Sequence, residues 1–188
     1  MIRGWELLRS EFVGHFRIFD MKVDHRRRPS DGHEQEFIIL DAPDWVVAVA
    51  VTKNDEVVMI RQWRAGSDTI ELEVPGGMID PKDPDPLQGG LRELREETGF
   101  TGSGACVMGE ALPNSAFMDN HCYFVYVEDC AHTHERELDP GEEIETVLVP
   151  VQDVFKHIEN GDIRHPLVIS ALTRFAMKRG LLGSSDSS

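Results

Sequence analysis

Several features that mark large classes of proteins are scarce or missing in this sequence of 188 residues. No apolar run is long enough to span a membrane, and the first residues, MIRGWELLRSEFVG, lack the apolar core of a secretory signal. The three cysteines are an odd number without CxxC spacing, so we expect reduced thiols in a cytoplasmic protein. The eight histidines show no paired spacing typical of metal ligands near residues 76–100, and we assign them no role.

Positive charge is also scarce. Nineteen lysines and arginines face 34 aspartates and glutamates, which gives a net charge of -15. Because the phosphate backbone of a nucleic acid needs a basic binding surface, this balance argues against a nucleic-acid polymer as partner. The length suits one domain with a small appended subdomain.

Against this background, residues 76–100 carry the most information. Asp85 and Pro86 are typical of a helix N-cap and first helical residue, with Gln88 at the third helical position. Gly99 supplies the left-handed residue that commonly ends a helix. The spacing therefore predicts a helix over 86–98, whose leucines recur at i, i+4 and i+7 and face a sheet.

Three glutamates of this helix are predicted to converge on one patch. Glu93, Glu96 and Glu97 stand at i, i+3 and i+4, and the single Arg92 paired with Glu96 does not neutralise them. Carboxylate oxygens gathered in this way suit Mg²⁺, with Mn²⁺ as a second possibility. A solvated amphipathic helix is the alternative, but the glycines at 76 and 77 allow a close approach and offer backbone carbonyls.

Residues 92–100, Arg-Glu-Leu-Arg-Glu-Glu-Thr-Gly-Phe, resemble the second half of the box of the Nudix hydrolases. They match Arg-Glu-(aliphatic)-x-Glu-Glu-x-Gly-(aliphatic) at every specified position, except that Phe100 fills the final apolar slot. The first half of the box departs from the family. The sixth residue after Gly77 is Asp83, where the family has Glu, and one extra residue separates it from Arg92.

The predicted elements and the resemblance imply the same fold class. We expect an α/β protein, a Nudix-type α/β/α sandwich with a mixed sheet, plus a small N-terminal β-strand subdomain. The expected strands are 12–24, 34–40, 46–52, 57–62, 70–74, 105–108, 122–127 and 145–150, with further helices at 151–160 and 166–178. The expected divisions are a strand subdomain over 1–42, a Nudix domain over 43–182 and a disordered tail over 183–188.

The order of motifs along the chain is similar to the branch of the family that hydrolyses ADP-ribose and nucleotide sugars. The stretch RQWR, residues 61–64, matches an Arg-Gln-(aromatic)-Arg pattern of that branch. Arg61 and Arg64 are candidates for binding a diphosphate, because a guanidinium holds phosphate oxygens bidentately. We place Glu73 with the substrate-binding residues, while pairing of the arginines with Glu71 and Glu73 is the alternative.

The base of a nucleotide requires a flat apolar surface. Phe37 and Trp45 lie in or beside the N-terminal strands, where the branch stacks its nucleobase, and Trp45 is the favoured residue. Each of them is otherwise a core residue. The resemblance also implies a homodimer, in which the N-terminal strands are exchanged and the active sites are completed at the interface.

The resemblance implies a reaction as well. Glu93 and Glu97, with Glu96 and the carbonyl of Gly76, would bind Mg²⁺, which polarises a diphosphate and lowers the pKa of water. Hydrolysis would release a nucleoside monophosphate and a sugar phosphate. Arg92, placed with the catalytic residues, would hold the carboxylates in position by salt bridges.

A second acidic stretch supplies the candidate for the general base. Residues 133–143 are polar and broken by Pro and Gly, which is typical of a loop before a strand. Glu142 and Glu143 are the candidates in this loop, with Glu145 next.

The competing interpretations of the whole chain are a Nudix hydrolase of another nucleotide or coenzyme diphosphate, and a binding module that has lost catalysis.

Overall fold

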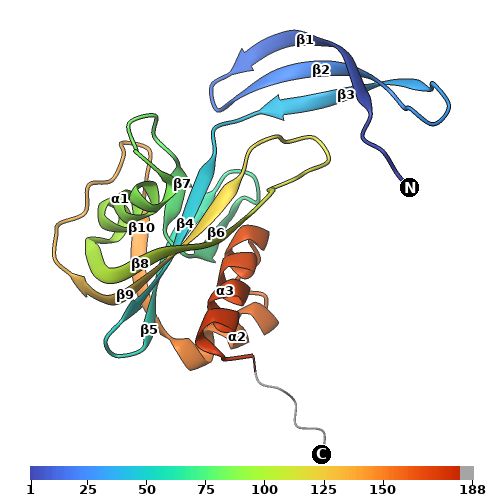
Figure 1. The fold of residues 1–188 in the computed structure, drawn as a ribbon. Helices are drawn as coiled ribbons and strands as arrows, with labels where there is room; N and C mark the ends of the chain where they lie inside the picture. Colours follow the sequence, from blue (N-terminus) through green and yellow to red (C-terminus); the bar gives the residue numbers. More distant parts are fainter. Residues whose placement is uncertain (183–188) are drawn as a thin grey trace, which may run out of the picture. The chain divides into compact units, whose positions relative to one another are not determined.

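The computed structural model describes residues 1–182, so the predicted disordered tail lies outside the described residues. The chain forms two compact units (Figure 1). The first contains Met1–Asp44 together with Leu112–His121, and the second contains the remainder, beginning with Trp45–Ala111 and continuing from Cys122. Within residues 1–182 no helix has the length and apolar character needed to cross a membrane.

The first unit is built on a three-stranded antiparallel sheet. Its strands, in the spatial order β1-β2-β3, are β1 (Glu6–Phe16), β2 (Phe19–Arg27) and β3 (Glu34–Asp41). The prediction of one strand over 12–24 was wrong, because Arg17 takes a left-handed conformation with φ of 48° and turns the chain. The turn itself contains no Gly or Pro.

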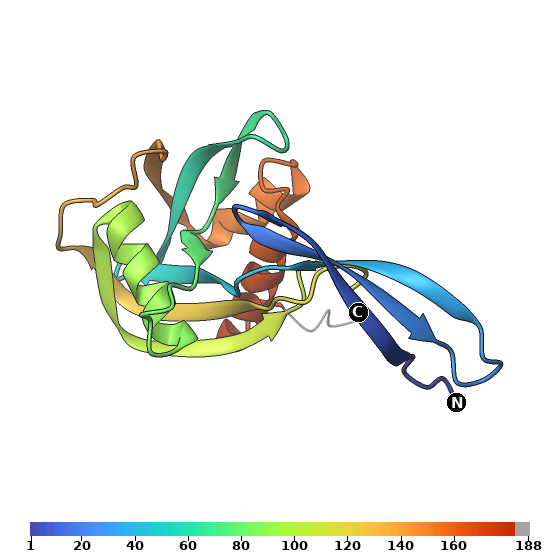
Figure 2. The same ribbon diagram turned by 90° about the horizontal axis from the view of Figure 1, so that it is seen from above.

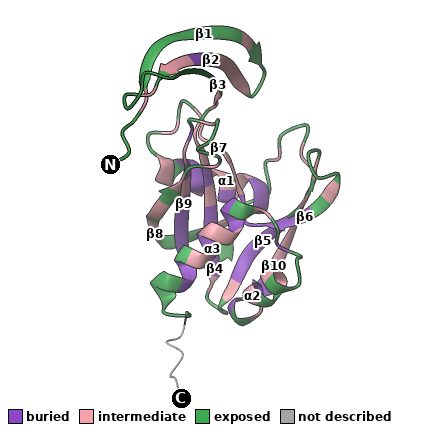
Figure 3. Cartoon of the chain, turned by 90° about the vertical axis from the view of Figure 1, so that its right-hand side faces the viewer, coloured by how far each residue is buried: buried purple, intermediate pink, exposed green. Residues whose placement is uncertain are grey.

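This small sheet has almost no interior. Asp24 is its one fully buried residue in β1–β3, whereas Phe12 is 65% exposed and Ile38 is 53% exposed. Figure 3 shows the contrast with the second unit, in which buried residues fill the central strands. A three-stranded sheet without a covered apolar face is only marginally stable alone, so the first unit needs further packing partners.

The second unit contains a seven-stranded mixed sheet. The main path runs β10-β5-β4-β9-β8, with β6 paired to β5 and β7 paired to β4. The pairing of β4 with β9 is parallel, and the other pairings are antiparallel. The strands are β4 (Trp45–Thr52), β5 (Glu56–Arg64), β6 (Thr69–Glu73), β7 (Gly76–Met78), β8 (Phe100–Ala111), β9 (Cys122–His132) and β10 (Ile144–Pro150).

Helices cover both faces of this sheet (Figures 1 and 2). Helix α1 (Pro86–Thr98) lies on one face, and helices α2 (Val151–Glu159) and α3 (Pro166–Arg179) lie on the other. Strand β4 shows how both cores form, because its buried side chains alternate between them. Val46 packs in the core beside Leu94 of α1, and Val49 packs in the core beside Phe175 of α3. The predicted α/β/α sandwich is therefore confirmed.

The ends of α1 follow from its capping residues. The Asp85 carboxylate accepts a hydrogen bond from the backbone N–H of Gln88 at 2.9 Å, and Pro86 begins the helix. At the other end Gly99 has a φ of 74° and donates its N–H to the carbonyl of Arg95. The predicted helix over 86–98 is confirmed at both ends, which fixes the direction in which its glutamates point.

Candidate active site

The glutamates of α1 gather beside strand β7. Glu97 is 3% exposed, and its Oε2 accepts a hydrogen bond from the backbone N–H of Gly76 at 2.9 Å. The Glu93 side chain is 12% exposed, while that of Glu96 is 27% exposed. Glu93 and Glu97 therefore both lie against the glycine pair that begins β7, while Glu96 is joined to Glu93 through Arg92.

The two glycines make this close packing possible. A Cβ atom on Gly77 would lie 2.7 Å from Oε1 of Glu93, inside the contact limit of real side chains. A Cβ atom on Gly76 would lie 2.3 Å from the carbonyl oxygen of Val46. Only glycine fits at either position, so the pair brings the backbone against the carboxylates.

Arg92 joins the carboxylates to the first half of the box. Its Nη1 donates to Glu93 and to Glu96, in each case at 2.9 Å, as the i, i+4 spacing predicts for Glu96. Its Nε and Nη2 donate to the Asp83 carboxylate at 2.9–3.3 Å. Asp83, which replaces the family's Glu, thus occupies an ion pair and contributes to holding Arg92 in place.

The extra residue in the box is absorbed by a tight turn before α1. The backbone N–H of Asp83 donates to the carbonyl of Asp80 at 2.8 Å, and Asp83 Oδ2 accepts from the N–H of Asp80 at 2.9 Å. This pair of bonds directs the Asp83 carboxylate toward Arg92 despite the altered spacing. Sequence comparison alone left the role of Asp83 open, because counting residues does not reveal a turn.

Burial and mutual repulsion raise the pKa values of Glu93 and Glu97, because the positive charge nearby does not fully compensate them. Burial raises the pKa of Glu93 to about 7, against the opposing effect of Arg92. Burial and the neighbouring charge of Glu93 raise the pKa of Glu97 to about 9. A divalent cation would relieve both effects, since it replaces lost hydration and offsets the repulsion.

The donor set fits a hard cation. Three carboxylates and the nearby carbonyl of Gly76 are oxygen ligands of the kind that Mg²⁺ prefers. Within residues 1–182 no three acidic, histidine or cysteine side chains already form a compact cluster for a metal ion. Arg92 engages one oxygen each of Glu93 and Glu96, so a bound cation would share these two carboxylates with the guanidinium.

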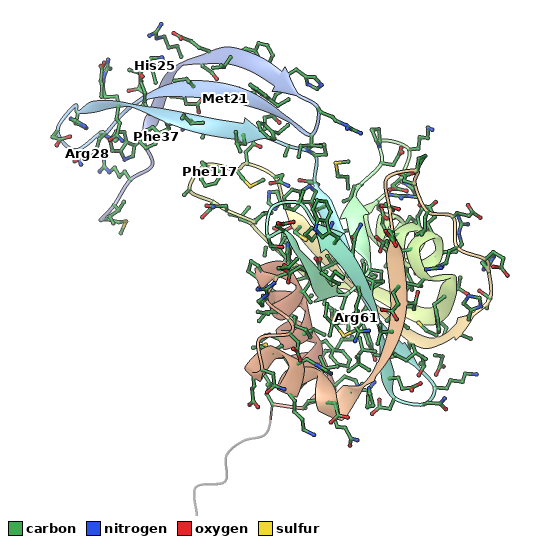
Figure 4. The ribbon with its side chains drawn as sticks, turned by 180° about the vertical axis from the view of Figure 1, so that it is seen from behind. Met21, His25, Arg28, Phe37, Arg61 and Phe117 are labelled. Atoms are coloured by element: carbon green, nitrogen blue, oxygen red, sulfur yellow. The ribbon has the colours of Figure 1, made fainter. Side chains whose placement is uncertain are left out.

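The arginines of the RQWR stretch lie on opposite faces of β5. Arg64 is on the α1 face, where its Nε and Nη2 donate to Glu73 at 2.8 and 2.9 Å. Arg61 projects from the other face and pairs with Glu145 at 3.2 Å (Figure 4). Side chains alternate along a strand, so only Arg64 is directed toward the face that holds the glutamates.

The loop of residues 133–143 is anchored to the end of α1. The backbone N–H groups of Thr133 and His134 donate to the carbonyl of Gly99, and that of Glu137 donates to the carbonyl of Glu96. Glu142 follows this anchor in the chain. Its negative charge contributes to raising the pKa of both Glu93 and Glu97.

The two loop candidates differ in their surroundings. Glu142 is half-buried and closes a turn by accepting the N–H of Asp139 at 3.0 Å, whereas Glu143 is exposed. Glu145 is directed away from the loop into the ion pair with Arg61. Glu142 is therefore the candidate that the structure brings into electrostatic range of the predicted metal ligands.

The aromatic candidates lie in different units. Trp45 is half-buried at the start of β4 and packs against the core on the α2 and α3 side. Phe37 is on β3 in the first unit, with its ring 5.3 Å from that of Trp5 in an edge-to-face contact. Trp5 also lies under the guanidinium of Arg28 at 5.4 Å.

Comparisons with known proteins place the chain in a family. A family model described as NUDIX domain matches residues 41–172. The chain belongs to the Nudix family, and the prediction of a Nudix hydrolase is confirmed.

Individual relatives cover most of the chain. It is 26% identical to an ADP-ribose pyrophosphatase of Bacillus subtilis over 88% of this chain and 89% of the relative. It is 24% identical to the ADP compounds hydrolase NudE of Escherichia coli, over 73% of this chain and 72% of that one. A crystal structure of an ADP compounds hydrolase superposes with a TM-score of 0.85 at 21% identity, covering 97% of this chain and 98% of that chain. This last likeness supports the fold.

Proposed function

We propose that this protein hydrolyses the diphosphate bond of a nucleoside diphosphate sugar, with ADP-ribose as the first candidate. The observation that carries the proposal is the pair of carboxylates Glu93 and Glu97, which are largely removed from solvent against a glycine pair and have raised pKa values. Relatives that act on ADP-ribose and ADP compounds support the choice of substrate class.

The proposed metal ligands are Glu93, Glu96, Glu97 and the carbonyl of Gly76, with Mg²⁺ as the expected ion and Mn²⁺ as a substitute. A bound divalent ion would supply charge for the diphosphate and acidify a water molecule. Arg92 keeps the carboxylates together through its three ion pairs, and is a positioning residue in this scheme.

The remaining steps fall to this chain's own side chains. Glu142 takes the proton of the attacking water, because it is the loop glutamate whose charge reaches Glu93 and Glu97. Arg64 binds an oxygen of the diphosphate through the part of its guanidinium that Glu73 leaves free. For Arg61, Phe37 and Trp45, contact with the substrate remains a proposal from the family pattern.

We further propose a cytoplasmic homodimer that exchanges the strands of residues 1–42. The exposed apolar side chains of β1 and β3 support a partner for this sheet, since Phe12 and Ile38 are more than half exposed. The three cysteines are free thiols, which is consistent with a reducing compartment.

A panel of nucleotide sugars tests the reaction. The protein with Mg²⁺ would be incubated with ADP-ribose, ADP-glucose, GDP-mannose and UDP-glucose, and the products separated by chromatography. The expected products from ADP-ribose are AMP and ribose 5-phosphate. Preference for another base or sugar would correct the substrate, and failure to cleave any diphosphate while metal is bound would refute the proposed reaction.

The second candidate function is hydrolysis of a different ADP-containing compound. The similarity to an enzyme named for ADP compounds favours it. Adding diadenosine polyphosphates and NADH to the same panel separates the two, since the ratio of kcat/KM values ranks the substrates directly.

A further inference from the structure

Two buried glutamates on β6 are each held by an arginine. Glu71 is 6% exposed and Glu73 is 3% exposed, and both project from the same face because they are two residues apart. Glu71 accepts hydrogen bonds from Arg164 at 2.6 and 3.3 Å. Glu73 accepts from Arg64. The strand thus offers two similar ion pairs, of which one includes the proposed diphosphate ligand.

The pair of Glu73 and Arg64 uses a defined part of the guanidinium. Oε1 of Glu73 accepts from Nε at 2.8 Å, and Oε2 accepts from Nη2 at 2.9 Å, so both carboxylate oxygens are engaged. This fork arrangement fixes the plane and the direction of the guanidinium. A substrate oxygen therefore cannot use the Nε and Nη2 edge of Arg64, and must bind at Nη1 and the outer hydrogen of Nη2.

The guanidinium edge of Arg64 that Glu73 does not bind is accessible, and its charge interacts with those of Glu97 and Glu142. The Arg64 side chain is 41% exposed, whereas the Glu73 side chain is 4% exposed. The pairing with Glu73, and next the charges of Glu97 and Glu142, raise the pKa of the guanidinium. One side of Arg64 is thus fixed in the sheet, and its charge is within electrostatic range of the proposed metal ligand and base.

We propose that Glu73 is a positioning residue, which orients Arg64 so that its Nη1 end receives the diphosphate beside the metal ligands. This inference rests on the proposed function. It replaces the expectation that Glu73 contacts the substrate, because a buried carboxylate with both oxygens engaged offers a phosphate only repulsion. Glu73 acts on the reaction only through Arg64.

The test compares Glu73→Gln with the matched control Glu71→Gln, since both remove one charge from a buried pair on the same strand. Glu73→Gln should weaken binding of the non-hydrolysable α,β-methylene analogue of ADP-ribose by roughly tenfold to a hundredfold, the usual value of a charge-assisted fork. It should raise KM for ADP-ribose accordingly. Glu71→Gln should leave both constants within about twofold of wild type.

Two further measurements separate positioning from a structural role. Arg64→Lys keeps the charge without the fork, so it should weaken binding of the analogue to a similar extent even if Glu73→Gln folds poorly. In Arg64→Ala, adding guanidinium ion should restore part of the activity, and this rescue should disappear in the double variant with Glu73→Gln. Thermal unfolding of each variant shows that it is folded.

The outcomes distinguish this inference from the proposed function. If the wild-type protein neither binds the analogue nor cleaves ADP-ribose, the proposed function fails and the inference fails with it. If wild type is active, but Glu73→Gln matches Glu71→Gln and Arg64→Lys keeps full affinity, only the positioning role is refuted. Equal rescue by guanidinium with and without the Glu73 carboxylate would likewise refute it.

Discussion

Helix α1 and strand β6 both bury glutamates, but they compensate the charge in different ways. On β6 each carboxylate faces its own arginine, Glu71 with Arg164 and Glu73 with Arg64. On α1 Glu93 and Glu96 share Arg92 with Asp83, whereas Glu97 accepts only a backbone hydrogen bond from Gly76. Burial raises the pKa of Glu93 and Glu97. The strand is neutralised by the protein itself, whereas the helix retains negative charge at the place where a cation would bind.

The comparison shows that burial alone does not identify a functional carboxylate. Burying an ionised group is unfavourable unless it is paired, so a pair such as Glu71 and Arg164 needs no ligand to explain it. A buried carboxylate that no arginine neutralises needs a further cation or a proton. Glu97 is of this second kind, because its hydrogen bond comes from the neutral backbone N–H of Gly76.

Among the changes that test the difference between the glutamates of α1 and those of β6, removing the Glu97 carboxylate should have the largest effect on activity. In Glu97→Gln we expect kcat/KM for ADP-ribose with Mg²⁺ to fall by about 10³-fold or more, because an essential metal ligand is lost. The measurement is steady-state turnover over a titration of Mg²⁺. Glu71→Gln serves as the control on β6. Full turnover of Glu97→Gln at saturating Mg²⁺ would remove Glu97 from the proposed site.

The next effect distinguishes the two loop glutamates. We expect Glu142→Gln to lower kcat by about 10²-fold, since general-base catalysis contributes roughly that much or more. Glu143→Gln should leave kcat nearly unchanged, because Glu143 is exposed. The measurement is kcat of both variants at saturating ADP-ribose and Mg²⁺. The opposite ranking of the two variants would assign the base to Glu143.

A smaller effect should appear in stability as a function of pH. A carboxyl group whose pKa is raised on folding stabilises the protein fully below its unfolded pKa, and this contribution is lost as the pH rises through the folded pKa. For Glu93 and Glu97 the loss extends to about pH 7 and about pH 9. At about 1.4 kcal/mol per pKa unit, metal-free protein should therefore lose several kcal/mol in the free energy of unfolding between pH 5 and 9.

Adding Mg²⁺ should reverse much of this loss, because a bound cation stabilises the ionised carboxylates. Denaturant unfolding at pH 5, 7 and 9, with EDTA or with Mg²⁺, measures the effect. In Glu97→Gln the dependence on pH and on metal should both be reduced. If wild type shows the same stability at all three pH values without metal, the pKa values of Glu93 and Glu97 are not raised by folding.

Local sequence signals predicted the parts of the site that depend on one helix. The caps at Asp85 and Gly99, and the i, i+3, i+4 spacing of the glutamates, describe α1 correctly because helix geometry relates such positions directly. Alternation along β5 also places Arg61 and Arg64 on opposite faces, because they are an odd number of residues apart. The sequence therefore already indicated that Arg61 and Arg64 would not both contact one diphosphate, although both are candidates for it.

Long-range pairing could not be predicted in the same way. The bond between Glu73 and Arg64 depends on the register of β5 against β6, in which Ile60 is opposite Glu73. The ion pair of Arg61 with Glu145 depends on β10, which is far along the chain. The missed turn at Arg17 has a different cause, since a left-handed arginine carries none of the usual signals of a turn.

The turn between Asp80 and Asp83 has a consequence for evolution. Because two hydrogen bonds within the turn direct the Asp83 carboxylate to Arg92, the chain tolerates an insertion inside the most characteristic segment of its family. In this chain an acid stays in contact with the arginine, although the number of residues between them differs from the family's pattern. A search for divergent members of the family should therefore test for this contact between an acid and the arginine, even where the spacing of the signature differs.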